Sequence, residues 1–168
     1  MIREMNFSLE VGPHTDLDTL PPVKDVYITM LPGGDYKETA EKSSDLVKRG
    51  FNPVPHFPAR SIADEAQLKD YISRCKDVGA KQALVIGGSR DPIGKFDSSI
   101  QILETGFFDG IKVGIAGHPE GSPDMSDTKL EKAMMDKKPY ADYIVTQWLL
   151  NSQPIVDFIS KQSVPVHV

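Results

Sequence analysis

The chain has 168 residues, with 24 acidic and 19 basic side chains, one cysteine and a formal net charge of −5. A single cysteine excludes an internal disulfide framework and a multi-cysteine metal site, and an acidic balance without basic clusters argues against nucleic acid as a partner. No apolar run approaches the roughly 20 residues of a membrane span, and the first residues lack the apolar core of a signal peptide. The sequence therefore predicts a cytoplasmic protein with no membrane partner.

Short apolar segments rich in β-branched residues alternate with segments of helical character along the whole chain. This alternation predicts parallel strands joined by crossover helices. No linker or low-complexity segment divides residues 1–168, so we expect one domain. The predicted strands are Asn6–Val11, Asp25–Met30, Phe51–Phe57, Gln82–Gly88, Ile111–Gly117, Asp142–Gln147 and Val164–Val168. The predicted helices are Asp35–Arg49, Ser61–Val78, Phe96–Phe108, Asp127–Lys138 and Pro154–Lys161.

Some local features refine this prediction. Two prolines, Pro53 and Pro55, weaken the third strand because proline cannot donate a ladder hydrogen bond. Ser61 is the expected N-cap of the helix that follows. Cys75 lies on the apolar face of that helix, which predicts inert packing in the core. Met135 is placed with the inward face of the fourth helix.

Polar residues follow the carboxyl ends of six consecutive predicted strands. Ligands bind at these ends both in an open doubly wound sheet and in a (β/α)₈ barrel, and periodicity alone does not separate the two. A complete barrel typically takes about 250 residues, so the length permits only an incomplete one. One shared site explains the joint placement better than six unrelated roles. The residues are Glu10, Thr29, His56, the Gly87–Asp91 loop, His118 and Gln147.

Familiar phosphate-loop, dinucleotide-binding and nucleophile-elbow motifs are absent from the sequence. The four histidines contain no helical pair at spacing i, i+4, which argues against a zinc-protease helix and leaves no expected metal ligand. Carboxylates, histidines and an arginine at one rim suit a bound polar cofactor and one acid rather than a nucleophile triad.

Five segments occur in an order and spacing that characterise one enzyme family: Phe7–Pro13, Pro55–Phe57, Ser89–Gly94, Gly114–Pro123 and Ala141–Trp148. Through them the chain resembles methylenetetrahydrofolate reductases, flavin-dependent barrel enzymes of one-carbon metabolism. The resemblance implies an α/β fold of the TIM-barrel type with about seven parallel strands. It also implies a reaction: hydride passes from NADH or NADPH to FAD and then to 5,10-methylenetetrahydrofolate, giving 5-methyltetrahydrofolate for methionine biosynthesis. The full-length protein would be a homo-oligomer.

The resemblance assigns roles by position. Glu10 stands at the catalytic glutamate, a general acid that helps to open the folate ring, and covering such a carboxyl from water favours its protonated form. Asp91 stands at an aspartate near both flavin and folate, and Gln147 at a glutamine that binds the pterin ring. The implied flavin contacts are Thr29, His56, Arg90, Asp91, Phe96, His118 and Ser122.

The sequence also departs from the family pattern. Arg90 lies directly before Asp91, where the family has arginine, glycine and aspartate in that order. His118 replaces a common tyrosine and Ser122 replaces a histidine. Family members run on to an eighth strand, so we expect this chain to be a truncated product. Three alternatives stay open: a non-flavin folate-dependent one-carbon transferase, a non-catalytic folate-binding fragment, and an α/β domain of unrelated function.

Overall fold

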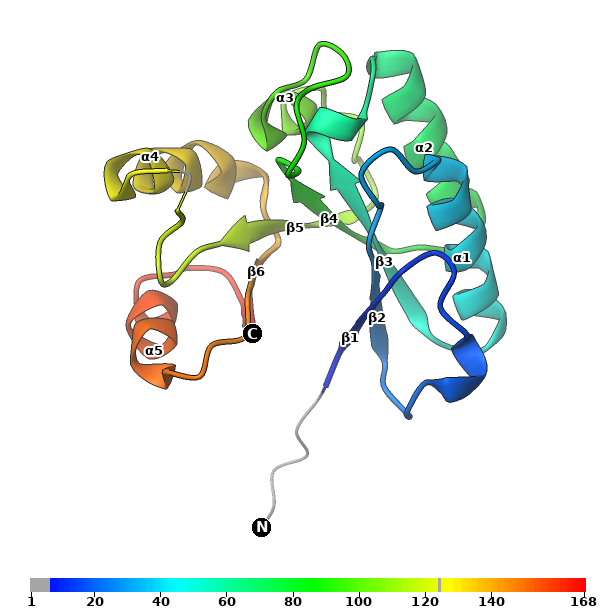
Figure 1. Cartoon of the computed structure of the whole chain (residues 1–168), viewed down its shortest axis with the longest axis horizontal. Coiled ribbons are helices and arrows are strands. Elements are labelled where there is room, and N and C mark those ends of the chain that lie inside the picture. Colours follow the sequence, from blue (N-terminus) through cyan, green and yellow to red (C-terminus); the bar gives the residue numbers. More distant parts are fainter. Residues whose placement is uncertain (1–6, 124) are drawn as a thin grey trace.

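The computed structural model describes residues 7–123 and 125–168. Seven parallel strands form one sheet in the order β1-β2-β3-β4-β5-β6-β7, so each strand pairs with the next one along the chain. The sheet curls into an open half-barrel with its helices outside (Figure 1). The fold is therefore an incomplete α/β barrel of the TIM type, which confirms the prediction from the sequence.

All seven predicted strands are present, although Asn6 lies outside the described residues. The strands are β1 (Leu9–Val11), β2 (Asp25–Ile28), β3 (Asn52–Pro58), β4 (Gln82–Ile86), β5 (Lys112–Gly117), β6 (Tyr143–Thr146) and β7 (Val166–His167). The α-helices are α1 (Tyr36–Lys48), α2 (Glu65–Asp77), α3 (Ser99–Leu103), α4 (Asp127–Lys137) and α5 (Ser152–Ser160). Three short 3₁₀ helices are η1 (Leu17–Thr19), η2 (Ala59–Ser61) and η3 (Lys138–Tyr140).

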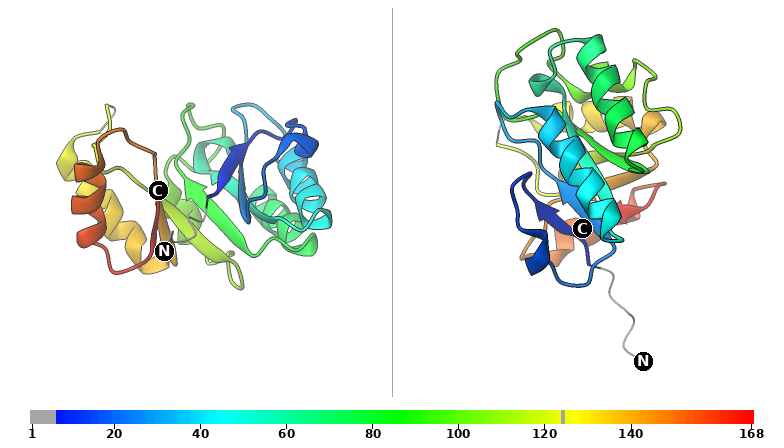
Figure 2. Two further views of the ribbon diagram at one scale, coloured as in Figure 1. Left: turned by 90° about the horizontal axis from the view of Figure 1, so that it is seen from below. Right: turned by 90° about the vertical axis from the view of Figure 1, so that its right-hand side faces the viewer.

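The main core lies between the outer face of the sheet and the helices. Alternate strand residues point outward, among them Val85 and Ile115, and both are fully buried. On α2 the buried residues recur at spacings of three and four, so one side of the helix packs on the sheet. Figure 2 shows α1 and α2 side by side along this face. Cys75 is fully buried there, as predicted, and burial raises the pKa of its thiol to about 12.

The inner face of the curled sheet, which we call the lumen, carries a separate and more polar set of side chains. Tyr27, Val54 and Leu84 form a small apolar cluster on it. The Tyr27 hydroxyl lies 3.1 Å from Nδ1 of His167, which joins β2 to β7 across the lumen. Burial raises the pKa of Tyr27 to about 12, so the tyrosine remains a neutral hydrogen-bonding partner at neutral pH. The Tyr143 ring stacks on His167 at 4.6 Å between centroids.

The third strand is regular despite its prolines. Asn52 donates its amide to Lys24 O, which places the amides of alternate residues toward β2 and the nitrogens of Pro53 and Pro55 toward β4. Pairing with β4 begins only at His56. Neither proline therefore removes a hydrogen bond from that ladder.

Three details of the predicted helices are wrong. Helix α2 begins at Glu65 and not after Ser61, because the Asp64 carboxylate accepts the Gln67 amide at 2.8 Å and Ser61 lies in η2. Helix α3 is much shorter than predicted, since Gly106, at φ +70°, turns the chain soon after Leu103. Met135 on α4 is 73% exposed and does not face the core.

Gly114 on β5 gives a prediction about this packing. A Cβ atom there would lie 2.4 Å from Cε2 of Tyr143, whose hydroxyl donates to Ala83 O at 3.1 Å. We expect Gly114→Ala to lower the free energy of unfolding by about 1–3 kcal/mol, because the buried ring must move. A Cβ at Gly87 meets no atom within 4 Å, so Gly87→Ala is the matched control. Chemical denaturation measures both, and equal stability of the two variants would contradict this account.

Candidate functional site

Three of the predicted site residues meet at the carboxyl ends of the first strands. Glu10 lies on β1, Thr29 directly follows β2, and His56 lies on β3. Parallel pairing places Glu10 opposite Tyr27, so Glu10 and Thr29 share the inner face. The Thr29 hydroxyl donates to Oε1 of Glu10 at 2.5 Å. The carboxylate is otherwise exposed, so it is oriented by a neighbour and remains accessible to a ligand.

His56 is the most unusual member of this group. Its side chain is 5% exposed, and its Nε2 has no hydrogen-bond partner within the described part of the chain. Its ring packs edge-on against Tyr27, with centroids 6.1 Å apart. Burial lowers the pKa of His56, and the Glu10 carboxylate partly opposes this shift. At neutral pH the ring is thus neutral and holds one buried polar atom without a partner.

The loop between β4 and α3 carries Arg90 and Asp91. The Arg90 guanidinium lies beside the turn that follows β2, because a Cβ at Gly33 would be 3.6 Å from its Nη1. Asp91 is exposed. Phe96, predicted as a flavin contact, is 3% exposed and belongs to the main core cluster. Its ring therefore anchors the loop, and its role toward a cofactor stays a prediction.

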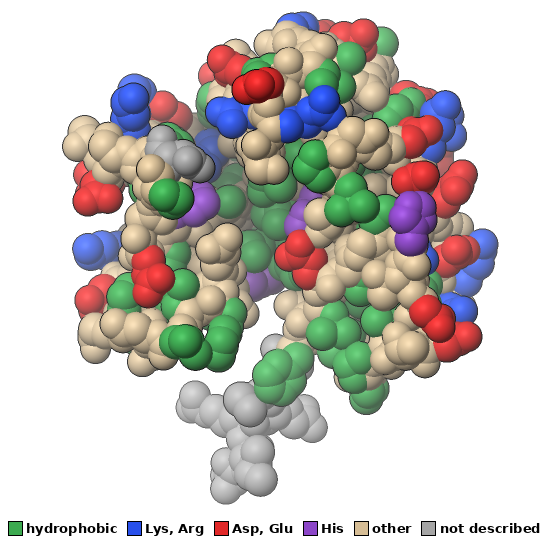
Figure 3. All heavy atoms as spheres, in the orientation of Figure 1, with side chains coloured by type: hydrophobic (Ala, Val, Ile, Leu, Met, Phe, Trp, Pro, Cys, Tyr) green, Lys and Arg blue, Asp and Glu red, His purple; other side chains and the backbone are tan. Residues whose placement is uncertain are grey.

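The remaining predicted residues surround one cavity of about 440 Å³ at the ends of β5 and β6. It is lined by Gly117–Pro123, Asp127, Gln147 and Leu149, and so by His118, Ser122 and Gln147 together. His118 is accessible to solvent. Its pKa is nevertheless lowered, first by partial burial of the ring and second by the positive charge of Lys137. The space-filling view shows a hollow with histidine and apolar side chains on its walls (Figure 3). The site residues therefore form two groups, one on β1–β3 and one on β5–β6.

Two positively charged residues near the rim were not singled out in the sequence. Lys137 at the end of α4 is partly buried, its amine lies 3.5 Å from Ala116 O, and burial lowers its pKa. Arg60 in η2 binds the β4–α3 loop through its side chain. Sequence reasoning missed both residues because each contacts backbone carbonyls that are distant in the sequence. No motif or spacing signals such a contact.

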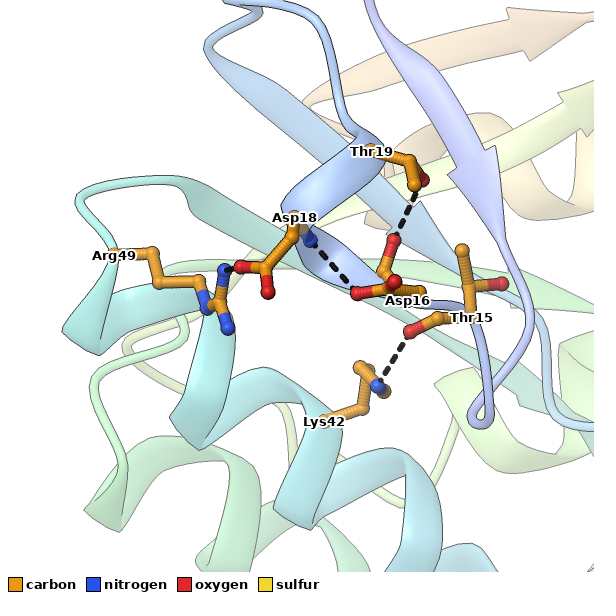
Figure 4. A network of polar contacts seen from close by, with 6 residues as sticks. All are labelled: Thr15, Asp16, Asp18, Thr19, Lys42 and Arg49. Carbon is orange, nitrogen blue, oxygen red and sulfur yellow. Dashed lines mark hydrogen bonds and ion pairs between the residues drawn. The ribbon is translucent and has the colours of Figure 1, made fainter.

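A second cavity, of about 460 Å³, lies between η1 and α1. Its charged groups already have partners within the protein (Figure 4). Lys42 donates to Thr15 O at 2.9 Å, Arg49 forms an ion pair with Asp18, and Lys48 pairs with Asp45 at 3.1 Å. The Arg49 pair joins η1 to the end of α1 and the Lys42 bond joins the turn before η1 to α1, whereas the Lys48 pair lies within α1.

No protein-family model matches the chain. In the described ranges, no three histidine, cysteine or acidic side chains gather closely enough to bind a metal ion. The same residues contain no helix with the length and apolar character to cross a bilayer. The features that point to a function are therefore the geometry of the rim residues and the motifs in which they stand.

The burial of His56 predicts a pH dependence of stability. A histidine whose pKa is lower in the folded than in the unfolded chain binds fewer protons when folded, so stability falls as the pH drops below the unfolded pKa of about 6.5. His118 contributes in the same direction. We expect the midpoint of thermal unfolding to fall on acidification, and His56→Gln to reduce that fall.

The matched control is His14→Gln, because the His14 side chain is 73% exposed, in contrast to the buried ring of His56. Thermal melts followed by circular dichroism at several pH values measure the effect. A His56→Gln variant with the acid sensitivity of the unaltered protein would disprove the assignment.

Proposed function

We propose that the chain is a flavin-dependent oxidoreductase of the methylenetetrahydrofolate reductase type. The reaction would be reduction of 5,10-methylenetetrahydrofolate to 5-methyltetrahydrofolate by NADH or NADPH through FAD. The observation that carries the proposal is the group at the ends of β1–β3. Glu10 is held by Thr29 at 2.5 Å, near the buried Nε2 of His56, which has no hydrogen-bond partner among the described residues. An acid and a free polar atom on one rim are what such a site requires.

The polar groups of the rim fit a flavin. A flavin offers ring nitrogens, carbonyl oxygens and hydroxyls, and it therefore needs several separate hydrogen-bonding partners. Nε2 of His56 lacks a partner among the described residues, and His118 and Ser122 line the cavity at β5. The residues that would hold FAD are Thr29, His56, Arg90, His118 and Ser122. When bound, FAD supplies a group that accepts and donates hydride.

The protein's own residues would bind and protonate the folate. Glu10 is the general acid, and its hydrogen bond from Thr29 fixes the direction of the carboxyl. Glu10 is exposed in the free protein, so bound cofactor and substrate must exclude water from it. Gln147, at the cavity by β6, can donate to and accept from the pterin ring at once. Asp91 would stabilise positive charge that develops on the substrate.

One observation favours a second candidate, a folate-dependent one-carbon transferase without flavin. Phe96 is 3% exposed and belongs to the main core cluster, so its ring offers little surface to a flavin. Glu10 and Gln147 would bind and protonate a folate equally well in that case.

A direct test separates these functions. The purified chain is titrated with FAD and followed by absorbance and by quenching of flavin fluorescence. We expect a bound yellow flavin that bleaches with NADH or NADPH and regains its colour with methylenetetrahydrofolate. Folate binding without flavin binding would favour the transferase, and binding of neither ligand would refute both proposals.

Glu10→Gln tests the acid itself. The amide keeps the shape of the side chain but cannot protonate the substrate, so we expect folate reduction to fall by about 10²–10⁴-fold. Reduction of bound flavin by the nicotinamide should stay within about twofold, because that half-reaction needs no acid from Glu10. Stopped-flow absorbance measures the two half-reactions separately.

Glu41→Gln is the matched control, since Glu41 is exposed on α1 and away from the rim. Folate reduction that survives unchanged in Glu10→Gln would rule out the proposed role of Glu10.

A further inference from the structure

The loop from Gly87 to Ser98, which carries Arg90 and Asp91, runs against the segment that follows β3. Three main-chain hydrogen bonds join the two: Arg60 donates to Gly87 O at 3.0 Å, Ile93 donates to Arg60 O at 3.1 Å, and Lys95 donates to Ala63 O at 3.1 Å. Residues 60–63 therefore support the loop through hydrogen bonds along its length.

The Arg60 side chain binds both ends of the same loop. Its Nε donates to Asp97 O at 2.8 Å and its Nη1 donates to Gly88 O at 3.3 Å. Both acceptors are main-chain carbonyls, and within the described residues the guanidinium has no carboxylate partner. One planar group thus fixes the distance between the start and the end of the loop.

The two halves of the loop are held unequally. The second half is anchored by Phe96 in the core and by the ion pair of Lys95 with Glu65 at 2.5 Å. Gly94 lies so close to Ala63 that a Cβ would be 1.9 Å from Ala63 O. Among the described residues, the first half has no core side chain or ion pair of this kind. It is held instead by the main-chain hydrogen bonds of Arg60 with Gly87 and Ile93 and by the bond from the Arg60 guanidinium to Gly88 O.

Arg90 and Asp91 lie in this weakly anchored half. In the part of the chain that the structure describes, neither side chain makes a hydrogen bond or an ion pair. Ser89, Asp91 and Ile93 are exposed, so apolar burial does not hold the tip either. The direction in which these two side chains point is therefore set by the backbone of the loop.

We propose that Arg60 is a positioning residue, whose guanidinium holds the β4–α3 loop in the form that presents Arg90 and Asp91 to the ligand. Its effect on ligand binding rests on the proposed function, whereas its effect on the loop does not. Arginine is needed because its rigid fork reaches two carbonyls at once, while the single ammonium of lysine cannot reproduce that geometry. A positive charge at position 60 is therefore not enough to hold the loop.

The test compares Arg60→Lys and Arg60→Ala with the unaltered chain in two measurements. Hydrogen exchange by mass spectrometry reports the protection of residues 87–98, and titration reports the dissociation constant of FAD. We expect exchange within residues 87–93, where the Ile93 amide donates to Arg60 O, to be at least tenfold faster in both variants, with α2 unchanged. We also expect FAD affinity to fall by about tenfold or more, with lysine giving little rescue.

Arg74→Lys is the matched control, because Arg74 is an exposed arginine in an ion pair with Asp70 on α2. Circular dichroism melts confirm that each variant is folded. If Arg60→Ala does not fold, the results for Arg60→Lys alone test the proposal.

The outcomes are distinct. Unchanged exchange over residues 87–93 overturns the proposal, and so does full rescue of both measurements by lysine. Faster exchange with unchanged FAD affinity refutes the link to the ligand and leaves the proposed function intact. If the unaltered chain takes up no FAD, the proposed function fails while the exchange experiment still decides whether Arg60 holds the loop.

Discussion

Parallel pairing in a fixed register is the constraint on which the candidate site depends. It sets the carboxyl ends of all seven strands at one rim and aligns alternate side chains on one face. On β2, Val26 and Ile28 pack outward in the cluster that contains Leu46 of α1, which leaves Tyr27 and Thr29 facing the lumen. A slip of one residue would exchange these faces and bury polar groups beneath a helix. The apolar packing outside the sheet thus secures the polar arrangement inside it.

The contrast between the apolar outer face and the polar inner face of the sheet explains which elements could be predicted from the sequence. The strands around Val85 and Ile115 were predictable because short, mostly apolar runs ended by glycine are typical of buried strands in a parallel sheet. The start of α2 was not, since Ser61 and Asp64 are both good caps and only the 3₁₀ turn after β3 selects the second. Phe96 was expected at the flavin only from the family resemblance. Its place in the main core cluster depends on residues that are distant in the sequence, which no local pattern reports.

The polar lumen could not be predicted for a similar reason. The hydrogen bond between Tyr27 and His167 joins residues 140 positions apart, and Tyr143 completes the group from a third strand. Apolar residues usually fill the inside of such barrels. Here aromatic residues with polar atoms replace part of that filling and find partners across the lumen, so the curvature of the sheet and the pairing of these groups support each other.

Unlike Tyr27 and His167, which are hydrogen-bonded to each other, His56 has a ring nitrogen without a partner among the described residues, and under the proposed function it would link stability to binding. A buried polar atom without a partner costs about 1–3 kcal/mol, and the free protein bears this cost at Nε2. A ligand that hydrogen-bonds this nitrogen would remove the cost, so Nε2 would favour binding of a polar ligand at the rim. The ligand would also cover Glu10, which Thr29 already orients. Under the proposed function, the buried Nε2 of His56 and the exposed acid would therefore contact the same polar ligand.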